Sequence, residues 1–141
     1  MRLLPGITTT RARVSGALAQ AKQARDYGIR ECALFVTRLE PVERFSLYQG
    51  LRRLRLLTFP FVHARSDMSA DEYALLTRQF GADRFNLHPA RQRAHNGELG
   101  ADLRRRIFIE NLPPPDGLQS ADLAGFAGIC LDLSHLEELR R

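Results

Sequence analysis

Two apolar runs, LTFPFVH (57–63) and RFNLH (84–88), decide the fold class of this protein. They are joined by 20 residues that include a helix-compatible segment, ADEYALLTRQF (70–80). Both runs are short and almost continuously apolar, which is typical of strands buried on both faces of a sheet. Two such strands separated by a helix predict a β-α-β unit in which the strands run parallel.

The segment between the two runs carries the signals of a helix at both ends. Ser69 precedes it as an N-cap, and Glu72 stands three residues later, where it would complete a capping box. Gly81 follows the last apolar residue and is placed to end the helix. The prediction is therefore a helix that begins after Ser69 and stops before Gly81.

The same alternation of apolar runs and helical segments extends along the whole chain. Strong helices are expected at 14–27, which Gly28 ends, and at 42–54, after Pro41. Short helices are expected within 90–105 and 113–126. Six strands are predicted, at 2–9, 32–39, 57–63, 84–88, 106–111 and 128–132. The expected fold class is α/β, with a parallel, barrel-like arrangement of strands and helices.

Length and composition indicate one globular domain spanning 1–141. The chain has 141 residues, of which 44% are hydrophobic and 26% charged, enough to bury a core. It contains no run of 18 apolar residues and no signal-peptide pattern, so no membrane association is expected. Cys32 and Cys130 both lie inside apolar runs, which indicates reduced thiols and a cytoplasmic protein.

The basic residues are almost all arginine. Lysine and arginine together number 21, Lys22 is the one lysine, and the net charge is +5. Basic clusters at 52–55 and 104–106 are compatible with phosphate binding. Acidic residues are interspersed nearly everywhere else, so the clusters are interpreted as solvated helix faces.

Four of the predicted strands end in a residue that can bind a metal. These residues are His63, His88, Glu110 and Asp132, spaced 22 to 25 positions apart, and His135 follows three residues after the last. The carboxyl ends of parallel strands lie on one face of a sheet or barrel, where active sites are built. Imidazoles and carboxylates together suit zinc, manganese or iron. The sequence therefore predicts a divalent-metal site at this edge.

Other polar residues near these strands are given ordinary structural roles. His95 lies in a polar stretch and is not expected to be a ligand, and Cys130 is assigned to the core. Arg65 and Asp67 follow His63 closely. They are interpreted as a loop ion pair, with contact to an anionic substrate as the alternative.

Four pieces of the chain resemble a known family. They are FVHARSD (61–67), NLHP (86–89), IENLP (109–113) and GICLDLSHL (128–136), of which the last two are the most specific. With them the chain resembles the xylose isomerase-like TIM-barrel superfamily. That superfamily includes sugar and sugar-phosphate isomerases and epimerases as well as zinc-dependent apurinic endonucleases.

The resemblance implies two sets of roles for the same residues. In the isomerase branch, Glu110 and Asp132 would bind the metal, Glu110 would also act in proton transfer, and His135, His63 and His88 would contact substrate. In the endonuclease branch, His63, His88 and His135 would also be ligands, and Glu110 would bridge two zinc ions. The implied metal is manganese or zinc.

The chain departs from the family in one respect. Family barrels have eight strands, and the last two carry a further histidine ligand and a second catalytic glutamate, which have no counterpart here. The expectation is therefore an incomplete barrel of about six strands, truncated at its C-terminal end. The first and sixth strands would be open edges, which favours self-association into a homo-oligomer and negligible activity.

Three functions remain as alternatives. The first is an isomerase or epimerase of a small carbohydrate or sugar phosphate, in which a metal-stabilised enediolate mediates proton transfer. The second is an apurinic endonuclease-like phosphodiesterase acting on nucleic acid, which the arginine content favours and the absence of tryptophan disfavours. The third is a non-catalytic remnant of the fold.

Overall fold

A single sheet of six parallel strands organises the chain. The computed structural model describes residues 3–10, 13–55, 57–89, 99–112 and 117–138. All neighbouring strands are parallel, and their order in the sheet is their order in the sequence. This confirms the expected parallel α/β class. The strands are β1 (Gly6–Thr8), β2 (Glu31–Phe35), β3 (Thr58–His63), β4 (Arg84–Leu87), β5 (Ile107–Glu110) and β6 (Gly128–Cys130).

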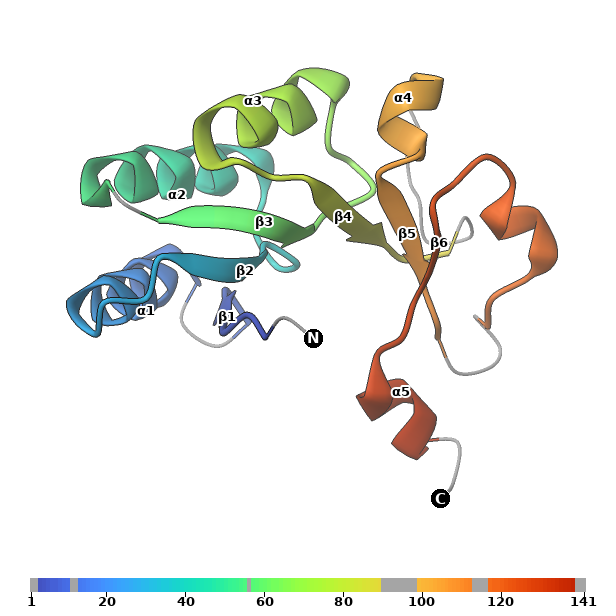
Figure 1. The fold of residues 1–141 in the computed structure, drawn as a ribbon, viewed down its shortest axis with the longest axis horizontal. Helices are drawn as coiled ribbons and strands as arrows, with labels where there is room; N and C mark the ends of the chain where they lie inside the picture. The colour runs from blue at the N-terminus through green and yellow to red at the C-terminus, as the bar shows by residue number, and fades with distance from the viewer. Residues whose placement is uncertain (1–2, 11–12, 56, 90–98, 113–116, 139–141) are drawn as a thin grey trace.

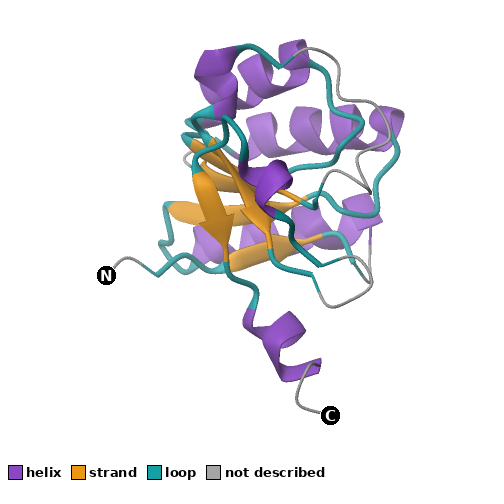
Figure 2. Cartoon of the chain, turned by 90° about the vertical axis from the view of Figure 1, so that its right-hand side faces the viewer, coloured by secondary structure: helices purple, strands orange, loops and turns teal. Residues whose placement is uncertain are grey.

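The helices connect consecutive strands. Right-handed crossovers between strands in sequential order place the connecting helices on the same face of a sheet. Figure 1 shows α1, α2 and α3 following one another along that side, and Figure 2 shows them behind the strands. No helix in the described ranges has the length and apolarity to cross a membrane. The helices are α1 (Arg13–Asp26), α2 (Pro41–Leu54), α3 (Ala70–Phe80), α4 (Ala101–Arg104) and α5 (Leu133–Glu138), with a 3-10 helix, η2 (Ser120–Leu123).

The helix-facing side of the sheet forms the hydrophobic core. Phe59 of β3 packs against Phe80 of α3, with ring centroids 5.8 Å apart. Phe85 of β4 packs against Tyr73 of the same helix at 4.8 Å. Both strand side chains are completely buried. Alternate strand residues therefore bury their side chains under the helices, as the period of a strand requires.

Asn86 alternates with Phe85 and so points to the opposite face, and His63, its register partner on β3, points there too. Phe59 and His63 face opposite sides, although they are four residues apart, because the pairing of β2 with β3 is irregular between Thr58 and Phe61. The ring of Phe35 lies 5.6 Å from that of His63, which lies 5.2 Å from that of His88. On the next strands, Asn86 donates a hydrogen bond to Glu110. Contacts across four neighbouring strands thus place polar side chains at the carboxyl edge of the face that the helices leave uncovered.

Small residues let α1 pack closely on α2. Ala17, Ala21 and Ala24 are the buried residues of α1. Gly50 of α2 lies so close to Leu18 that a Cβ atom at Gly50 would stand 2.6 Å from a methyl group of that leucine. The missing side chain of Gly50 therefore lets α2 approach Leu18 of α1 closely.

All six strands are shorter than predicted, β3 and β4 by one residue and the others by two or more. β1 covers Gly6–Thr8 rather than 2–9, and β2 stops at Phe35 because the chain turns at Val36, whose carbonyl accepts from the Leu39 backbone N–H. β6 stops at Cys130, because the backbone N–H of Asp132 donates to the side chain of Asn111 instead of to a strand. Asp132 therefore lies beyond the strand that was expected to end with it.

The expected short helices are found in part. α4 and η2 lie within the two segments where such helices were predicted. Residues 90–98 and 113–116 of those segments lie outside the described residues. α5 was not predicted. It projects away from the rest of the chain in Figures 1 and 2.

The predicted capping box of α3 is half right. The Ser69 hydroxyl accepts a hydrogen bond from the backbone N–H of Glu72, which confirms Ser69 as the N-cap, and Gly81 ends the helix in the left-handed conformation, at φ 68°. The second half of the box is absent, because the carboxylate of Glu72 does not accept a hydrogen bond from the Ser69 backbone N–H. Instead it accepts hydrogen bonds from Arg44, at 2.7 and 2.9 Å, and from the Tyr48 hydroxyl, at 2.8 Å.

This buried ion pair joins three parts of the fold. The side chains of Arg44 and Glu72 are 1% and 3% exposed. Arg44 also donates to the carbonyl of Leu39 at 3.1 Å and to Asp67 at 3.2 Å. The pair therefore connects α2 and α3 with the loop that follows β3. Because both charges are buried, removing one would leave the other without its partner, at a large cost in stability.

Glu72→Gln is expected to lower the free energy of unfolding by about 3 kcal/mol, because Arg44 would keep a buried charge without its bidentate acceptor. Urea denaturation followed by circular dichroism measures the change. Asp71→Asn removes a neighbouring exposed carboxylate from the same helix turn and should cost less than about 1 kcal/mol. Equal losses in the two variants would contradict the structural role of the pair.

Candidate metal centre

The centre is built around the carboxylate of Glu110. This residue ends β5, which pairs with β4 on one side and β6 on the other, and it is 2% exposed. Asn86 of β4 donates a hydrogen bond from its side-chain amide to Oε2 of Glu110. The amide fixes the direction in which this buried carboxylate points, and leaves Oε1 facing the opposite way.

Three imidazoles surround this carboxylate. His63 Nε2 lies 3.5 Å from Glu110 Oε2, while His88 Nε2 and His135 Nδ1 lie 3.8 and 3.6 Å from Oε1. Asp132 Oδ2 lies 3.9 Å from His135 Nε2. The structure thus brings together all five residues that the sequence proposed for the site, although their roles are not shown by this proximity.

The five side chains form two groups that share Glu110. One consists of His63, His88 and Glu110, and the other of Glu110, Asp132 and His135. Within each group one atom per residue lies within 4.8 Å of the others. Ligand atoms bonded at about 2.1 Å in a tetrahedral zinc site lie roughly 3.4 Å apart, so modest side-chain adjustment would let either group hold an ion. A buried His/Glu group of this kind could bind a metal.

Two atoms of the centre lack a hydrogen bond. His63 Nε2 and Asn86 Oδ1 are buried and have no partner among the described residues. Buried polar atoms in folded proteins are nearly always paired, so each exception needs a reason. For His63 the reason fits a ligand, because its bare nitrogen faces the Glu110 carboxylate at a distance too long for a hydrogen bond.

The ionisation states of His63 and Glu110 also suit a cation. Burial lowers the pKa of His63 to about 4, so its imidazole is neutral near pH 7 and can donate a lone pair. Burial, assisted by the negative charge of Asp132, raises the pKa of Glu110 to about 7. A bound cation would favour the ionised form of Glu110 and displace its proton.

Asp132 is held by the start of α5. Its Oδ1 accepts hydrogen bonds from the backbone N–H and the hydroxyl of Ser134, at 2.8 and 2.7 Å. Burial acts to raise the pKa of Asp132, but these hydrogen bonds and the nearby histidines lower it. The aspartate is therefore ionised near pH 7, with Oδ2 directed at His135.

Asn111 positions both Asp132 and His135. Its side chain accepts from the Asp132 backbone N–H at 2.6 Å and donates to the Asp132 carbonyl at 3.1 Å. Its own carbonyl lies 2.6 Å from His135 Nδ1, which must be the donor because a carbonyl only accepts. This contact leaves the lone pair on His135 Nε2. Histidines that bind a metal are commonly held in this way, by a hydrogen bond from the ring nitrogen that does not bind the metal.

Asn86 and Asn111 were not predicted from the sequence as parts of the site. One signal was available there, since Asn86 is a primary amide between the apolar residues Phe85 and Leu87 of a predicted strand. The structure buries it, at 2% exposed. A buried amide needs partners, and polar residues in buried strands often have a functional neighbour. Asn111 follows Glu110 directly and carried no such signal.

The remaining candidates are not members of the two groups. Cys130 was assigned to the core, but it is only half-buried and is not among the core residues. Burial, together with Glu110, raises the pKa of its thiol to about 11, which disfavours the thiolate that a metal requires. Arg65 and Asp67 form the predicted loop ion pair, at 2.9 Å. His95 lies outside the described residues.

Comparison of the chain with protein-family models, with curated proteins and with solved structures finds no match. The resemblance to xylose isomerase-like barrels therefore rests on the sequence motifs alone. The site is accordingly interpreted from its own geometry, in which four side chains surround the buried carboxylate of Glu110.

Glu110→Gln is expected to change how the stability of the metal-free protein depends on pH. Because the folded pKa of Glu110 is raised from 4.5 to about 7, this group stabilises the fold less and less as pH rises between those values. Each pKa unit corresponds to about 1.4 kcal/mol, so the cost at pH 8 is on the order of 3 kcal/mol. The variant lacks this cost and should gain stability relative to the parent as pH rises from 4.5 to 7.

The measurement is urea denaturation of both proteins across pH 4 to 8. His63 acts in the opposite direction. Its folded pKa is lowered from 6.5 to about 4, so its contribution rises with pH in nearly the same window. The difference between variant and parent isolates Glu110, because His63 is common to both. A difference that does not change with pH would contradict the raised pKa of Glu110.

Proposed function

We propose that the chain binds a divalent metal, zinc or manganese, and acts as an isomerase or epimerase of a small carbohydrate or its phosphate. The observation that carries this proposal is the buried Glu110 carboxylate, with imidazoles of His63, His88 and His135 within 3.8 Å of its oxygens. Glu110, Asp132 and His135 would hold the metal, and His63 and His88 would line the substrate pocket on the other side of Glu110. A bound metal would polarise neighbouring carbonyl and hydroxyl oxygens of the sugar.

The two oxygens of Glu110 support a division of roles. Oε2 faces His63 and Asn86, and Oε1 faces His88 and His135. One oxygen can therefore bind the metal while the other accepts a proton from the carbon next to the substrate carbonyl. Burial raises the pKa of Glu110 to about 7 in the metal-free protein, and a bound metal would keep this carboxylate ionised and so able to accept a proton at neutral pH.

The fold proposed for this function is a barrel of the xylose isomerase-like type. Six parallel strands in sequential order, with their helices on one side, support it, because a barrel requires that order. The placement of the candidate ligands at the carboxyl ends of the strands supports it as well, since barrel enzymes build their sites there.

Phosphodiester hydrolysis is the second candidate. The observation that favours it is the pair of ligand groups sharing Glu110, because two ions bridged by one carboxylate are the arrangement used to activate water and stabilise a leaving oxygen. In this alternative His63 and His88 are metal ligands, whereas in the isomerase proposal they line the substrate pocket. The number of ions bound distinguishes the two.

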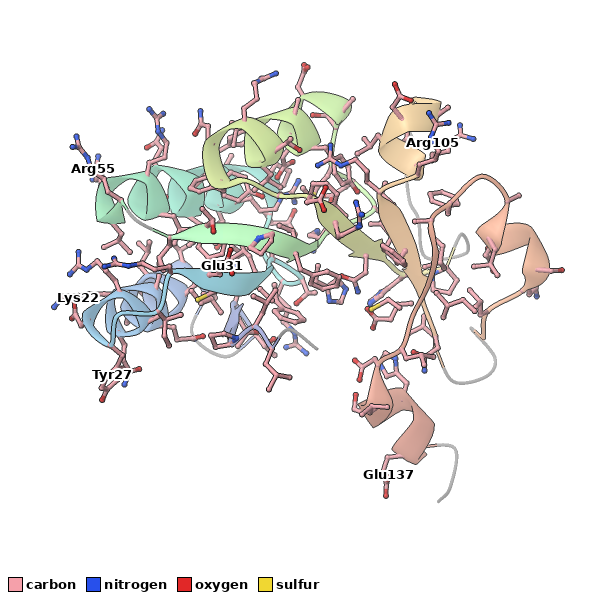
Figure 3. All side chains as sticks on the ribbon, viewed as in Figure 1. Lys22, Tyr27, Glu31, Arg55, Arg105 and Glu137 are labelled. Atoms are coloured by element: carbon pink, nitrogen blue, oxygen red, sulfur yellow. The ribbon has the colours of Figure 1, made fainter. Side chains whose placement is uncertain are left out.

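Metal binding tests the centre directly. Calorimetric titration with zinc and with manganese should show binding that weakens by roughly 100-fold or more in Glu110→Gln, because the shared carboxylate is lost. Glu137→Gln is the matched control, since Glu137 is an exposed glutamate that points away from the sheet at the far end of α5 (Figure 3). Tight binding in Glu110→Gln would mean that the ligands are wrongly assigned.

Proton exchange tests the chemistry. The metal-loaded protein, incubated in deuterated water with a panel of aldoses, ketoses and their phosphates, should replace the hydrogen beside the carbonyl by deuterium. Proton NMR would show the loss of that signal, and Glu110→Gln should abolish it. Two bound ions, no exchange, and hydrolysis of a simple phosphodiester would instead favour the second candidate.

A further inference from the structure

A small cavity opens beside the metal centre. Its volume is about 200 Å³, which corresponds to roughly seven water molecules and leaves room for a phosphate or carboxylate group with a few attached carbons. Because two candidate ligands form part of its wall, the cavity is continuous with the centre. It is lined by Thr37, His63, Ala64, Arg65, Ser66 and His88.

Arg65 presents unused hydrogen-bond donors to this cavity. Its Nε donates to Asp67 at 2.9 Å, its Nη1 to the carbonyl of Thr37 at 2.9 Å, and its Nη2 to Asp67 at 3.5 Å. A guanidinium has five N–H groups, so two of them are left without an acceptor in the described part of the chain. The side chain is 29% exposed, which lets a ligand reach those two groups.

The orientation of Arg65 is fixed before any ligand arrives. Asp67, which holds it, also accepts hydrogen bonds from Arg44 at 3.2 and 3.4 Å. Arg44 is itself buried against Glu72. The guanidinium of Arg65 is thereby braced by the ion pair that joins α2 and α3. A ligand that binds to it need not order a flexible side chain, which favours affinity.

The charged side chains around the cavity do not oppose the binding of an anion. Arg44 and Arg65 balance Glu72 and Asp67 in number, and both carboxylates are already hydrogen-bonded to the guanidinium groups. Two further acids of the described residues, Glu110 and Asp132, lie near the cavity beyond His63, and a bound metal would offset their charge. Planar guanidinium groups bind phosphate and carboxylate with paired, charge-assisted hydrogen bonds.

We propose that Arg65, with Thr37 and Ser66, forms an anion subsite that binds the terminal phosphate or carboxylate group of the substrate. The subsite places that group on the His63 and His88 side of the metal centre. It selects small substrates that carry an anionic end over neutral sugars. This assignment rests on the proposed function for its role in catalysis, but the binding of the anion itself does not require a metal.

The test uses protein freed of metal with a chelating resin. Inorganic phosphate and acetate are titrated separately and followed by NMR chemical shifts. Wild-type protein should bind at least one of them, at least tenfold more tightly than Arg65→Gln does. Arg84→Gln removes the same charge at the opposite end of β4, where the side chain is 50% exposed, and should bind as the wild type does. The tighter of the two anions identifies the chemistry of the substrate's end group.

Two further measurements keep the result interpretable. Circular dichroism of Arg65→Gln shows whether the variant is folded, and Thr37→Val, which replaces a hydroxyl by a methyl group, should weaken anion binding by a smaller factor. Equal anion binding by wild type and Arg65→Gln, or no binding by wild type, would overturn the subsite. Arg65-dependent phosphate binding in a chain that does not bind zinc would uphold the subsite and overturn the proposed metal-dependent function.

Discussion

All six strands run in one direction and pair in their order along the chain, and this constraint brings the end of every strand to the same edge of the sheet. The candidate ligands depend on it, because they come from segments 22 to 25 residues apart that have no local reason to meet. The pairing register of neighbouring strands then determines which residues stand side by side. Asn86 pairs with Phe108, and Glu110 follows Phe108 by two residues on the same face, so the carboxylate and its amide partner stand on adjacent strands. The site therefore exists only in the folded sheet, and any metal that binds it stabilises the fold.

Much of the fold could be predicted from the sequence because its signals are local. Continuous apolar runs marked the strands, and Ser69, Gly81 and Pro41 marked helix ends that the structure places within a residue of prediction. The boundaries of short strands could not be predicted, since they depend on where backbone groups find other partners. Asp132 left β6 for this reason, because the side chain of Asn111 replaces a strand as its partner.

The site was predictable as a set of residues but not as a network. Histidines and carboxylates after apolar runs are visible in a sequence, whereas the supporting hydrogen bonds join residues distant in the chain. Glu72 illustrates the limit. Its spacing from Ser69 favoured a capping box, but Arg44, 28 residues earlier, offers a charged partner in the buried interior. Two hydrogen bonds from a charged guanidinium outweigh one from a backbone N–H there, and only the tertiary structure reveals that competition.

The buried pair of Arg44 and Glu72 also restricts how this sequence can diverge. A substitution at either position leaves the opposite charge buried without its partner. A protein in which only one of the two residues has changed is therefore destabilised. Replacement by apolar residues is tolerated mainly when both change together, and Asp67, which shares Arg44, would have to adapt as well. Over evolutionary time the two positions should therefore covary, and the loop beside the candidate centre should drift more slowly than its exposure alone would allow.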